Sequence, residues 1–284
     1  MRVRFGFSIL LILLSFAVYA QEQPNQRIVA LAPHIVESLF AIGAGDRIIA
    51  TTDHADYPNA AKDIPQVGNY ARLQIERIVQ LQPDLVIGWK TGNPIEDLER
   101  LEKYGLKVVY SNPSQLEDVA SELRFYGELT SLTEQANALA ESYLSRLHTL
   151  KRKYSDAAPV VTFYEMWARP LRTVAKKAWL QQQIALCGAQ NPFSDLAEDY
   201  PLISLEQVLA SNPQVVIQPS PHSASSPDAL NWQQWQHIPA AKHGFVFHPN
   251  ADKTHRMTMR MLDELELLCQ NIDSAREFYI SNSD

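Results

Sequence analysis

Glycine is scarce in this 284-residue chain, and the glycine-dependent motifs of common enzymes are missing. Only 10 glycines occur, and the segment Gly43-Ala44-Gly45 serves only to end a predicted helix. The sequence holds no G-x-S-x-G elbow, no H-E-x-x-H, no P-loop and no glycine-rich dinucleotide loop. We therefore expect a protein that is not an enzyme and carries no resident cofactor.

Positive charge is also in short supply. The chain has 25 Lys and Arg against 32 Asp and Glu, a formal net charge of -7. Because binding to a phosphate backbone needs a basic face, this balance argues against nucleic acid as a partner. The 8 histidines are scattered without metal-ligand spacing. His248 and His255 near Asp252 form the one suggestive group, and surface or packing roles explain them better, so no metal site is expected.

Long apolar runs are lacking except at the N-terminus. Arg2 and Arg4 precede an apolar run over residues 5–18, and small residues lead up to Ala20. This pattern is typical of a secretory signal peptide over residues 1–20, with cleavage near Ala20-Gln21 and export to the periplasm. An uncleaved anchor helix is the alternative, but the run is short for the ~30 Å of a bilayer core. No cysteine follows the cleavage site, so a lipid anchor is not expected.

Cysteine is limited to two residues, Cys187 and Cys269. They form no C-x-x-C motif and show no metal-ligand spacing. In an oxidising compartment two lone cysteines are more often joined than reactive, so we predict a Cys187–Cys269 disulfide. Two buried free thiols are the alternative.

What the chain does contain is a regular alternation of short β-rich runs and helical patterns. Strands are predicted at 27–32, 47–52, 84–89, 107–110, 160–167, 215–217 and 245–247, and helices at 35–42, 73–81, 94–104, 179–186, 204–210 and 256–269. Strands spaced by helices indicate βαβ units and mostly parallel sheets. Residues 219–228, rich in Pro and Ser, predict an exposed loop.

One segment breaks this alternation. Over residues 131–154 apolar side chains recur every three or four positions, which predicts an amphipathic helix of ~35 Å. Ser131 and Glu134 have the spacing of a capping box at its start. We expect this helix, within residues 131–155, to connect an N-terminal lobe (21–130) to a C-terminal lobe (156–284).

The two predicted lobes share a repeated unit. Tyr70, Glu76, Pro83 and the strand 85–87 recur 130 positions later, as Tyr200, Glu206, Pro213 and the strand 215–217. Short matches of common residues are weak evidence, and chance recurrence is the alternative. The repeat favours an α/β fold of two similar lobes, each a mostly parallel sheet flanked by helices, joined by one long rigid helix.

Aromatic residues gather where such a fold would place a ligand. Ligands of open α/β sheets lie beyond the carboxyl ends of the strands, and clefts between domains are preferred sites. Five aromatic residues fall at predicted strand ends or in adjoining loops: Tyr57, Tyr70, Trp89, Trp167 and Tyr200. Core aromatics fall within elements, so this placement favours a cleft for a large, flat, partly apolar ligand.

Polar groups that could orient such a ligand are Asp252 and Arg256, four positions apart near the start of the final predicted helix. Arginine offers a planar fork of donors and aspartate offers acceptors, a combination suited to amide groups. From spacing alone, a helix-surface ion pair worth a few tenths of a kcal/mol is the better explanation.

A family resemblance rests on four stretches of sequence. They are 27–33 (RIVALAP), 56–58 (DYP), 75–89 (IERIVQLQPDLVIGW) and 204–217 (SLEQVLASNPQVVI). These stretches resemble the periplasmic solute-binding proteins of ABC importers in which a rigid helix connects the lobes. Within that class the chain, from about residue 27 to 273, is similar to the cobalamin-binding family.

The resemblance implies cobalamin or a related corrinoid as the transported ligand, and roles for particular residues. Tyr57 and Trp89 match aromatic positions that line the corrin site of the family. Tyr70 and Tyr200 fall where the family typically has tryptophan. Asp252 and Arg256 match, at the same separation, an acid and an arginine that bond corrin amides.

The same resemblance implies a partner and a covalent link. Glu76 and Glu206 match the two glutamates, one per lobe, that dock onto arginines of the inner-membrane ABC permease dimer. Cys187 and Cys269 match the disulfide pair of the family. We expect the free protein to be monomeric, and the long helix predicts only small lobe movement, because a continuous helix cannot absorb large changes in φ and ψ.

Departures from the family pattern leave other ligands open. Residues 165–173 (EMWARPLRT) do not follow it, so Trp167 is assigned to the site by position alone, and His54 replaces a small polar residue near Tyr57. A haem or ferric-siderophore ligand is the alternative. His54 or Tyr57 could bind a haem iron, whereas an anionic siderophore would depend on a few arginines, namely Arg256, Arg260, Arg72 and Arg169.

Overall fold

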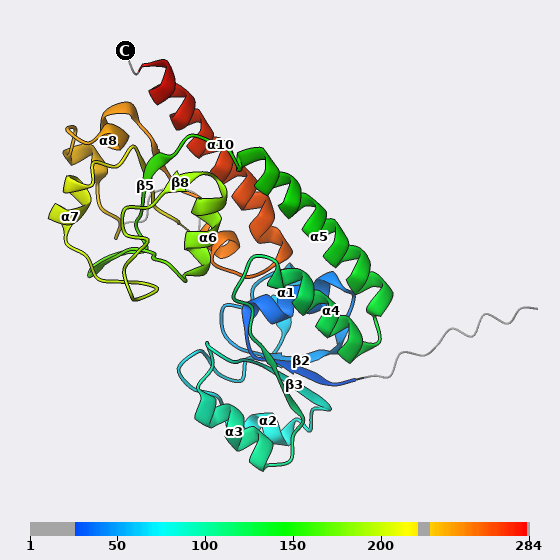
Figure 1. The fold of residues 1–284 in the computed structure, drawn as a ribbon. Helices are drawn as coiled ribbons and strands as arrows, with labels where there is room; N and C mark the ends of the chain where they lie inside the picture. The colour runs from blue at the N-terminus through cyan, green and yellow to red at the C-terminus, as the bar shows by residue number, and fades with distance from the viewer. Residues whose placement is uncertain (1–25, 221–227, 283–284) are drawn as a thin grey trace, which may run out of the picture.

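Two parallel sheets and two long helices make up the part of the chain that the computed structural model describes, residues 26–220 and 228–282 (Figure 1). The predicted signal peptide and most of the predicted loop at 219–228 lie outside these residues. Within the two described ranges, no helix is both long and apolar enough to cross a membrane.

The N-terminal sheet has four parallel strands in the order β2-β1-β3-β4. These are β1 (Ile28–Ala30), β2 (Ile48–Thr51), β3 (Leu85–Trp89) and β4 (Val108–Ser111). Side chains alternate between the two faces, so Ile28 and Ala30 join one apolar cluster while Val29 joins another. Helices α2 (Ile75–Gln80) and α3 (Ile95–Lys103) pack on the face of Val29, and α1 (Pro33–Ala41) packs on the opposite face.

The C-terminal sheet is also parallel and has the order β10-β9-β5-β8. Its strands are β5 (Val160–Tyr164), β8 (Ala189–Gln190), β9 (Val215–Ile217) and β10 (Val246–Phe247), and its helices are α6 (Trp179–Leu186), α7 (Leu205–Ala210) and α8 (Pro239–His243). The strand predicted at 160–167 ends at Tyr164. Trp167 instead belongs to an antiparallel hairpin of β6 (Trp167–Ala168) and β7 (Leu171–Arg172).

The internal repeat predicted from the sequence is confirmed by the backbone. Helices α2 and α7 are displaced by the same 130 positions as strands β3 and β9. Gln82 and Asn212, also an equivalent pair, both take the left-handed conformation after their helices, with φ of 46° and 49°. Read from the β8 end, the second sheet has the order β8-β5-β9-β10, which matches β2-β1-β3-β4. The two lobes therefore share one topology.

The predicted long helix is α5 (Thr133–Tyr154), but its start differs from the prediction. It follows α4 (Asp118–Thr130), a helix that was not predicted, through a two-residue turn. Ser131 ends α4 in the left-handed conformation, with φ of 59°, so it cannot adopt the extended N-cap geometry and the predicted capping box is wrong. A Cβ on Gly127 would lie 2.4 Å from the Cβ of Ala136, which shows that α4 and α5 approach closely enough to require glycine.

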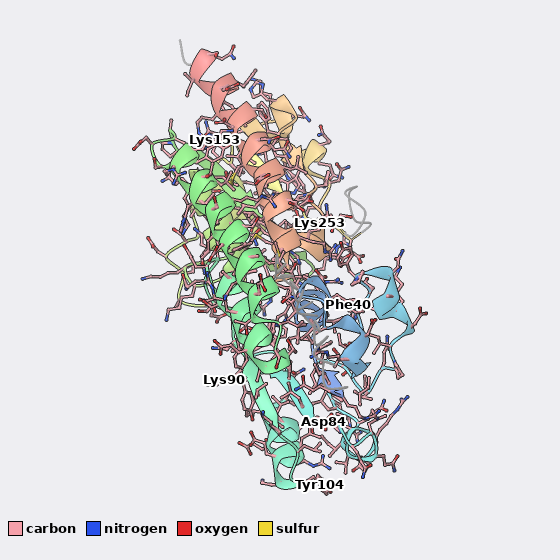
Figure 2. All side chains as sticks on the ribbon, turned by 90° about the vertical axis from the view of Figure 1, so that its right-hand side faces the viewer. Phe40, Asp84, Lys90, Tyr104, Lys153 and Lys253 are labelled. Atoms are coloured by element: carbon pink, nitrogen blue, oxygen red, sulfur yellow. A yellow bond between two sulfur atoms is a disulfide. The ribbon has the colours of Figure 1, made fainter. Side chains whose placement is uncertain are left out.

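The final helix is longer than predicted and starts later. It is α10 (Met259–Ser281), preceded by the short α9 (Ala251–Thr254). Asp252 is thus on α9 and Arg256 is in the turn between the helices, which corrects their predicted position on the final helix. Helices α5 and α10 lie side by side in both views (Figures 1 and 2). Arg146 of α5 joins them through ion pairs of 2.7 Å to Asp263 and 3.0 Å to Glu266.

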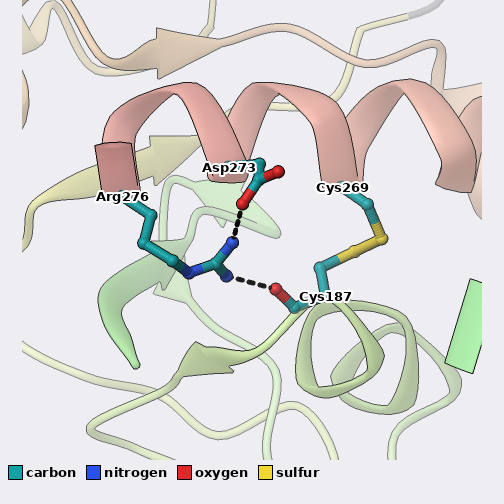
Figure 3. The surroundings of a disulfide bond; sticks show 4 residues. All are labelled: Cys187, Cys269, Asp273 and Arg276. Carbon is teal, nitrogen blue, oxygen red and sulfur yellow. Dashed lines mark hydrogen bonds and ion pairs between the residues drawn. A yellow bond between two sulfur atoms is a disulfide. The ribbon is translucent and has the colours of Figure 1, made fainter. Parts of the chain in front are cut away.

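The predicted disulfide is confirmed: Cys187, at the end of α6, is bonded to Cys269 of α10 (Figure 3). Both cysteines are fully buried. Arg276 reinforces the junction, because its guanidinium pairs with Asp273 and donates to the carbonyl oxygens of Cys187 and Ala158. The bond therefore attaches the last long helix to the C-terminal sheet layer.

Removal of this disulfide should lower stability without changing the fold. The bond closes a loop with a sequence separation of 82. Loss of that constraint on the unfolded chain should lower the free energy of unfolding by about 4 kcal/mol. We expect Cys187→Ser with Cys269→Ser to lower the urea midpoint with little change in the native circular dichroism spectrum. Reduced wild-type protein is the matched control, and an unchanged midpoint in both would contradict a stabilising role.

Candidate functional site

A cavity of about 520 Å³ lies between the lobes and is lined by residues from both. The N-terminal lobe contributes the ends of β3 and β4 with their following loops, and the C-terminal lobe contributes the loop after β5, α6 and the turn after α9. The lining residues are Trp89, Thr91, Asn112, Pro113, Ser114, Met166, Lys177, Ala178, Trp179, Leu180, Asp199, Tyr200, His255 and Met257. The position agrees with the expectation that a ligand lies beyond the carboxyl ends of the strands.

Trp89 forms the N-terminal wall of this cavity, and the turn after β3 holds it in place. The side chain of Asn93 accepts from the Trp89 backbone N–H at 2.7 Å and donates to the carbonyl of Leu31 at 2.9 Å. A Cβ on Gly92 would lie 1.8 Å from the indole Cε3, so only glycine lets the ring fold over this turn. Among the described residues, the buried indole Nε1 of Trp89 has no hydrogen-bond partner. A buried donor without a partner is costly to the folded state.

Tyr200 stands on the C-terminal side of the cavity. Its main-chain carbonyl accepts from Arg172 of β7 at 2.6 Å, and burial raises the pKa of its hydroxyl. Trp179, Met166 and Met257 complete this wall. Tryptophan, tyrosine and methionine give a large apolar contact area, and methionine adapts to irregular shapes. The wall is therefore suited to a broad, partly apolar ligand.

The remaining predicted aromatic residues do not line this cavity. Tyr70, the repeat partner of Tyr200, is 73% exposed on the surface of its lobe, and Trp167 is 56% exposed on its hairpin. Tyr57 stacks beneath the guanidinium of Arg260, 3.6 Å from the ring centroid, and lines a separate hollow of about 350 Å³ beside α1. Of the five aromatic residues predicted for the site, the structure brings together Trp89 and Tyr200.

His255 enters the cavity from the turn after α9. The carbonyl of the preceding Thr254 accepts two hydrogen bonds from α6, from Trp179 Nε1 at 3.3 Å and Gln183 Nε2 at 2.8 Å. The imidazole Nε2 lies 3.1 Å from the hydroxyl of buried Tyr164. Burial lowers the pKa of His255 to about 4, so the ring is neutral at physiological pH.

Arg256, next in the chain, connects the lobes instead of pointing freely into the cavity. Its Nη1 donates to Glu37 Oε1 at 2.9 Å and to Asp56 Oδ1 at 2.7 Å, both in the N-terminal lobe. Its Nη2 donates to the His54 carbonyl and, at 3.3 Å, to Asp252. Burial raises the pKa of Asp56, but the hydrogen bond and charge of Arg256 outweigh it and hold the pKa below its ordinary value.

The carboxylate of Glu37 is the centre of this junction. Its side chain is 3% exposed, and it also receives two hydrogen bonds from Arg260 of α10, one of them from Nε at 2.9 Å. A buried carboxylate is tolerated because both oxygens are bonded to guanidinium groups. Nothing in the sequence indicated a role for Glu37, because its partners Arg256 and Arg260 lie more than 200 positions away.

Charge within the cavity is nearly balanced. One lysine, Lys177, and one aspartate, Asp199, line it, together with the polar side chains of Thr91, Asn112 and Ser114. Within residues 26–220 and 228–282, no group of three or more His, Cys, Asp and Glu side chains could hold a metal ion. Stacking surfaces with a neutral polar rim can bind a ligand that carries amide groups without strong net charge.

Glu76 and Glu206 lie outside the cavity at equivalent positions of the two lobes. Each is the second residue of its helix, α2 and α7, and each is exposed. Glu76 lies 3.6 Å from Arg100, and hydrogen bonds from its own backbone N–H and from Ser204 lower the pKa of Glu206. The repeat therefore presents the same acidic group once on each lobe.

The known proteins that this chain resembles agree with this architecture. Residues 28–252 match the model of a family described as periplasmic binding protein. The chain is 36% identical over 255 residues to the vitamin B12-binding protein of Vibrio campbellii, covering 89% of this chain and 92% of that protein. It is 34% identical over 267 residues to the vitamin B12-binding protein of Vibrio vulnificus, covering 94% and 97%.

Solved structures show the same relationship. The periplasmic vitamin B12-binding protein BtuF of Vibrio cholerae superposes with a TM-score of 0.80 at 32% identity, covering 88% of this chain and 98% of that one. The apo haem-binding protein RhuT of Roseiflexus superposes with a TM-score of 0.76 at 23% identity, covering 88% and 99%, a likeness of fold alone. On its sequence and its two-lobed structure, this chain belongs to the periplasmic binding protein family.

Proposed function

We propose that this protein captures cobalamin or a related corrinoid in the periplasm and delivers it to an ABC importer of the inner membrane. The observation that carries the proposal is the inter-lobe cavity, which Trp89 lines from one lobe and Tyr200 from the other. The vitamin B12-binding proteins named above, at 32–36% identity, support the same ligand. Cobalamin is cargo in this proposal and not a resident cofactor.

The chemistry of the cavity suits a corrinoid. A corrin is a broad ring whose edge carries neutral amide side chains. Aromatic and methionine side chains supply apolar contact for its faces, and the polar groups of Thr91, Asn112 and Ser114 can pair with amides. Asp252 does not line the cavity and keeps 44% of its side chain exposed, so we expect it to accept from an amide at the outer rim of the ligand while Arg256 holds it in position.

Haem and ferric siderophores fit this cavity less well. Haem carboxylates and anionic siderophores would need cationic side chains, but among the described residues Lys177 is the one cation that lines the cavity, and Asp199 balances it. Arg256 and Arg260 are committed to Glu37. His54, the axial ligand considered from the sequence, has a highly exposed side chain that lies 3.7 Å from Asp53 and does not line the cavity.

Delivery depends on a docking surface for the permease dimer, and we propose that Glu76 and Glu206 provide it. They occupy equivalent sites on two lobes of one topology, so each can meet the same arginine-bearing surface on one half of a two-fold-symmetric partner. Placement at the first turn of a helix also stabilises each carboxylate.

The ligand is tested by calorimetric titration of the protein lacking residues 1–20 with cyanocobalamin, and with hemin in parallel. We expect one-to-one binding of cyanocobalamin at sub-micromolar affinity and much weaker binding of hemin, because in the described part of the chain a single lysine, Lys177, lines the cavity to meet two haem carboxylates. Failure of folded protein to bind cyanocobalamin would exclude the proposed cargo, and tight hemin binding would favour the haem alternative.

The wall of the cavity is tested by Trp89→Ala and Gly92→Ala. Loss of the Trp89 contact should weaken cyanocobalamin binding by about 2 kcal/mol, roughly thirtyfold in Kd. Gly92→Ala should weaken binding without removing the indole, because the new Cβ would displace the ring. Tyr104→Ala, which removes an exposed aromatic side chain outside the cavity, is the matched control. Equal affinity in all three variants would remove Trp89 from the site.

The docking surface is tested by charge reversal at Glu76 and Glu206 together. We expect Glu76→Lys with Glu206→Lys to lower corrinoid uptake by cells while the Kd for the ligand stays at its wild-type value, because both residues are exposed and neither lines the cavity. Glu134→Lys with Glu141→Lys, at two exposed positions of α5, changes the net charge by the same amount and is the matched control. Normal uptake by the double variant would show that these glutamates do not contact the permease.

A further inference from the structure

The wall residue Trp89 is in contact with a second ring, the imidazole of His34 near the start of α1. The two ring centroids lie 5.2 Å apart and the ring planes are inclined by 78°, an edge-to-face arrangement that aromatic pairs prefer. The side chain of His34 is buried, and it does not line the inter-lobe cavity. The imidazole therefore meets the indole from the interior of the lobe and not from the side of the ligand.

Ser111, at the end of β4, holds this imidazole in place. In the parallel sheet Ser111 is the register partner of Trp89 on β3, so both side chains point to the same face of the sheet, the face that α1 covers. The Ser111 hydroxyl lies 2.9 Å from His34 Nε2, and both side chains are buried. Either group can be the donor in this bond, so the position of the ring does not depend on the tautomer.

The contact between His34 and Trp89 joins two neutral rings. Burial lowers the pKa of His34 to about 3, so the imidazole carries no charge at physiological pH. A neutral ring can pack against apolar surface without leaving a buried charge unpaired. His34 is therefore suited to supporting an aromatic wall and gives the cavity no charge of its own.

Other features of the turn after β3 act on different parts of Trp89. Asn93 bonds to its main-chain N–H, and Gly92 leaves space for the ring. Neither contact determines how the indole is turned toward the cavity. Among the described residues, His34 is the one ring that pairs with this indole.

We propose that His34 is a positioning residue for ligand binding, which is held by Ser111 and keeps the indole of Trp89 in the orientation that contacts the cargo. The inference rests on the proposed corrinoid function and adds to it a residue that acts on the ligand through Trp89. A side chain that is ordered before the ligand arrives loses less conformational freedom on binding. Loss of His34 should therefore weaken binding although no atom of His34 touches the ligand.

The test is a double-mutant cycle on the Kd for cyanocobalamin, measured by calorimetry. We expect His34→Ala to raise Kd by about fivefold in the otherwise wild-type protein. In a protein that already carries Trp89→Ala it should have no further effect, because the side chain through which it acts is absent. Equal factors in the two backgrounds would overturn the inference, and so would a wild-type Kd in His34→Ala alone.

Two further variants separate positioning from a loss of stability. Ile78→Ala empties part of the apolar cluster on the opposite face of the sheet, so it should lower Tm and leave Kd unchanged. His34→Phe with Ser111→Ala keeps a ring against the indole and removes both polar partners together, so it should bind cyanocobalamin within about twofold of wild type. Binding by this folded double variant as weak as that of His34→Ala would show that the ring contact is not the cause. Failure of the wild-type protein to bind cyanocobalamin would instead remove the proposed function on which the inference rests.

Discussion

The buried carboxylate of Glu37, held by Arg256 and Arg260, is the interaction on which the binding site depends. Glu37 belongs to α1 of the N-terminal lobe, whereas Arg256 lies in the turn before α10 and Arg260 lies at the start of that helix, which packs on the C-terminal lobe. A cavity formed by two lobes has a defined width only if the lobes are held at a fixed separation. Helix α5 sets that separation on one side, and the Glu37 junction sets it at the cleft. Removal of one partner from a buried ion pair costs about 3–5 kcal/mol, because the other charge remains buried without a partner.

The same junction also shapes the wall of the cavity. Arg256 lies in a turn of the chain between His255 and Met257, and both of these neighbours line the cavity. The contacts that hold Arg256 therefore also hold His255 and Met257 in position. The carbonyl of Thr254 is held from the opposite direction by Trp179 and Gln183 of α6, and the disulfide attaches α6 to α10. Lobe spacing and ligand contacts are thus parts of one network, and a substitution that loosens the junction would also disturb the wall.

Local patterns in the sequence were enough to predict most of the fold and only part of the site. Strands, the long helix and the repeat follow from periodicity and from turn residues, and the predicted disulfide follows from compartment and cysteine number. The start of α5 was wrong because a tight turn onto α4 forces Ser131 into the left-handed conformation, a tertiary constraint. Trp89 was identified because it ends a strand, and Tyr200 through the repeat. Glu37 and the role proposed for His34 depend on contacts between distant segments, and no spacing in the sequence encodes them. Tyr70, predicted for the site from its place before α2, is exposed and is not among the residues that line the cavity.

Under the proposed function, the difference between Tyr70 and Tyr200 would let a duplicated unit serve two partners of different symmetry. On the outside of the lobes the repeat is retained, so Glu76 and Glu206 occupy equivalent helix positions and suit a two-fold-symmetric permease. Inside the cavity the repeat is broken, since the N-terminal lobe presents Trp89 and the C-terminal lobe presents Tyr200 and His255. A corrinoid has two unlike faces, and two unlike walls can bind it in one orientation, whereas two identical walls could not. The Glu37 junction joins the lobes, and in the proposed delivery it would help to preserve that orientation when the protein meets the importer. The two lobes therefore differ inside the cavity and keep equivalent geometry outside it. Both features suit a carrier that presents an asymmetric cargo to a symmetric transporter.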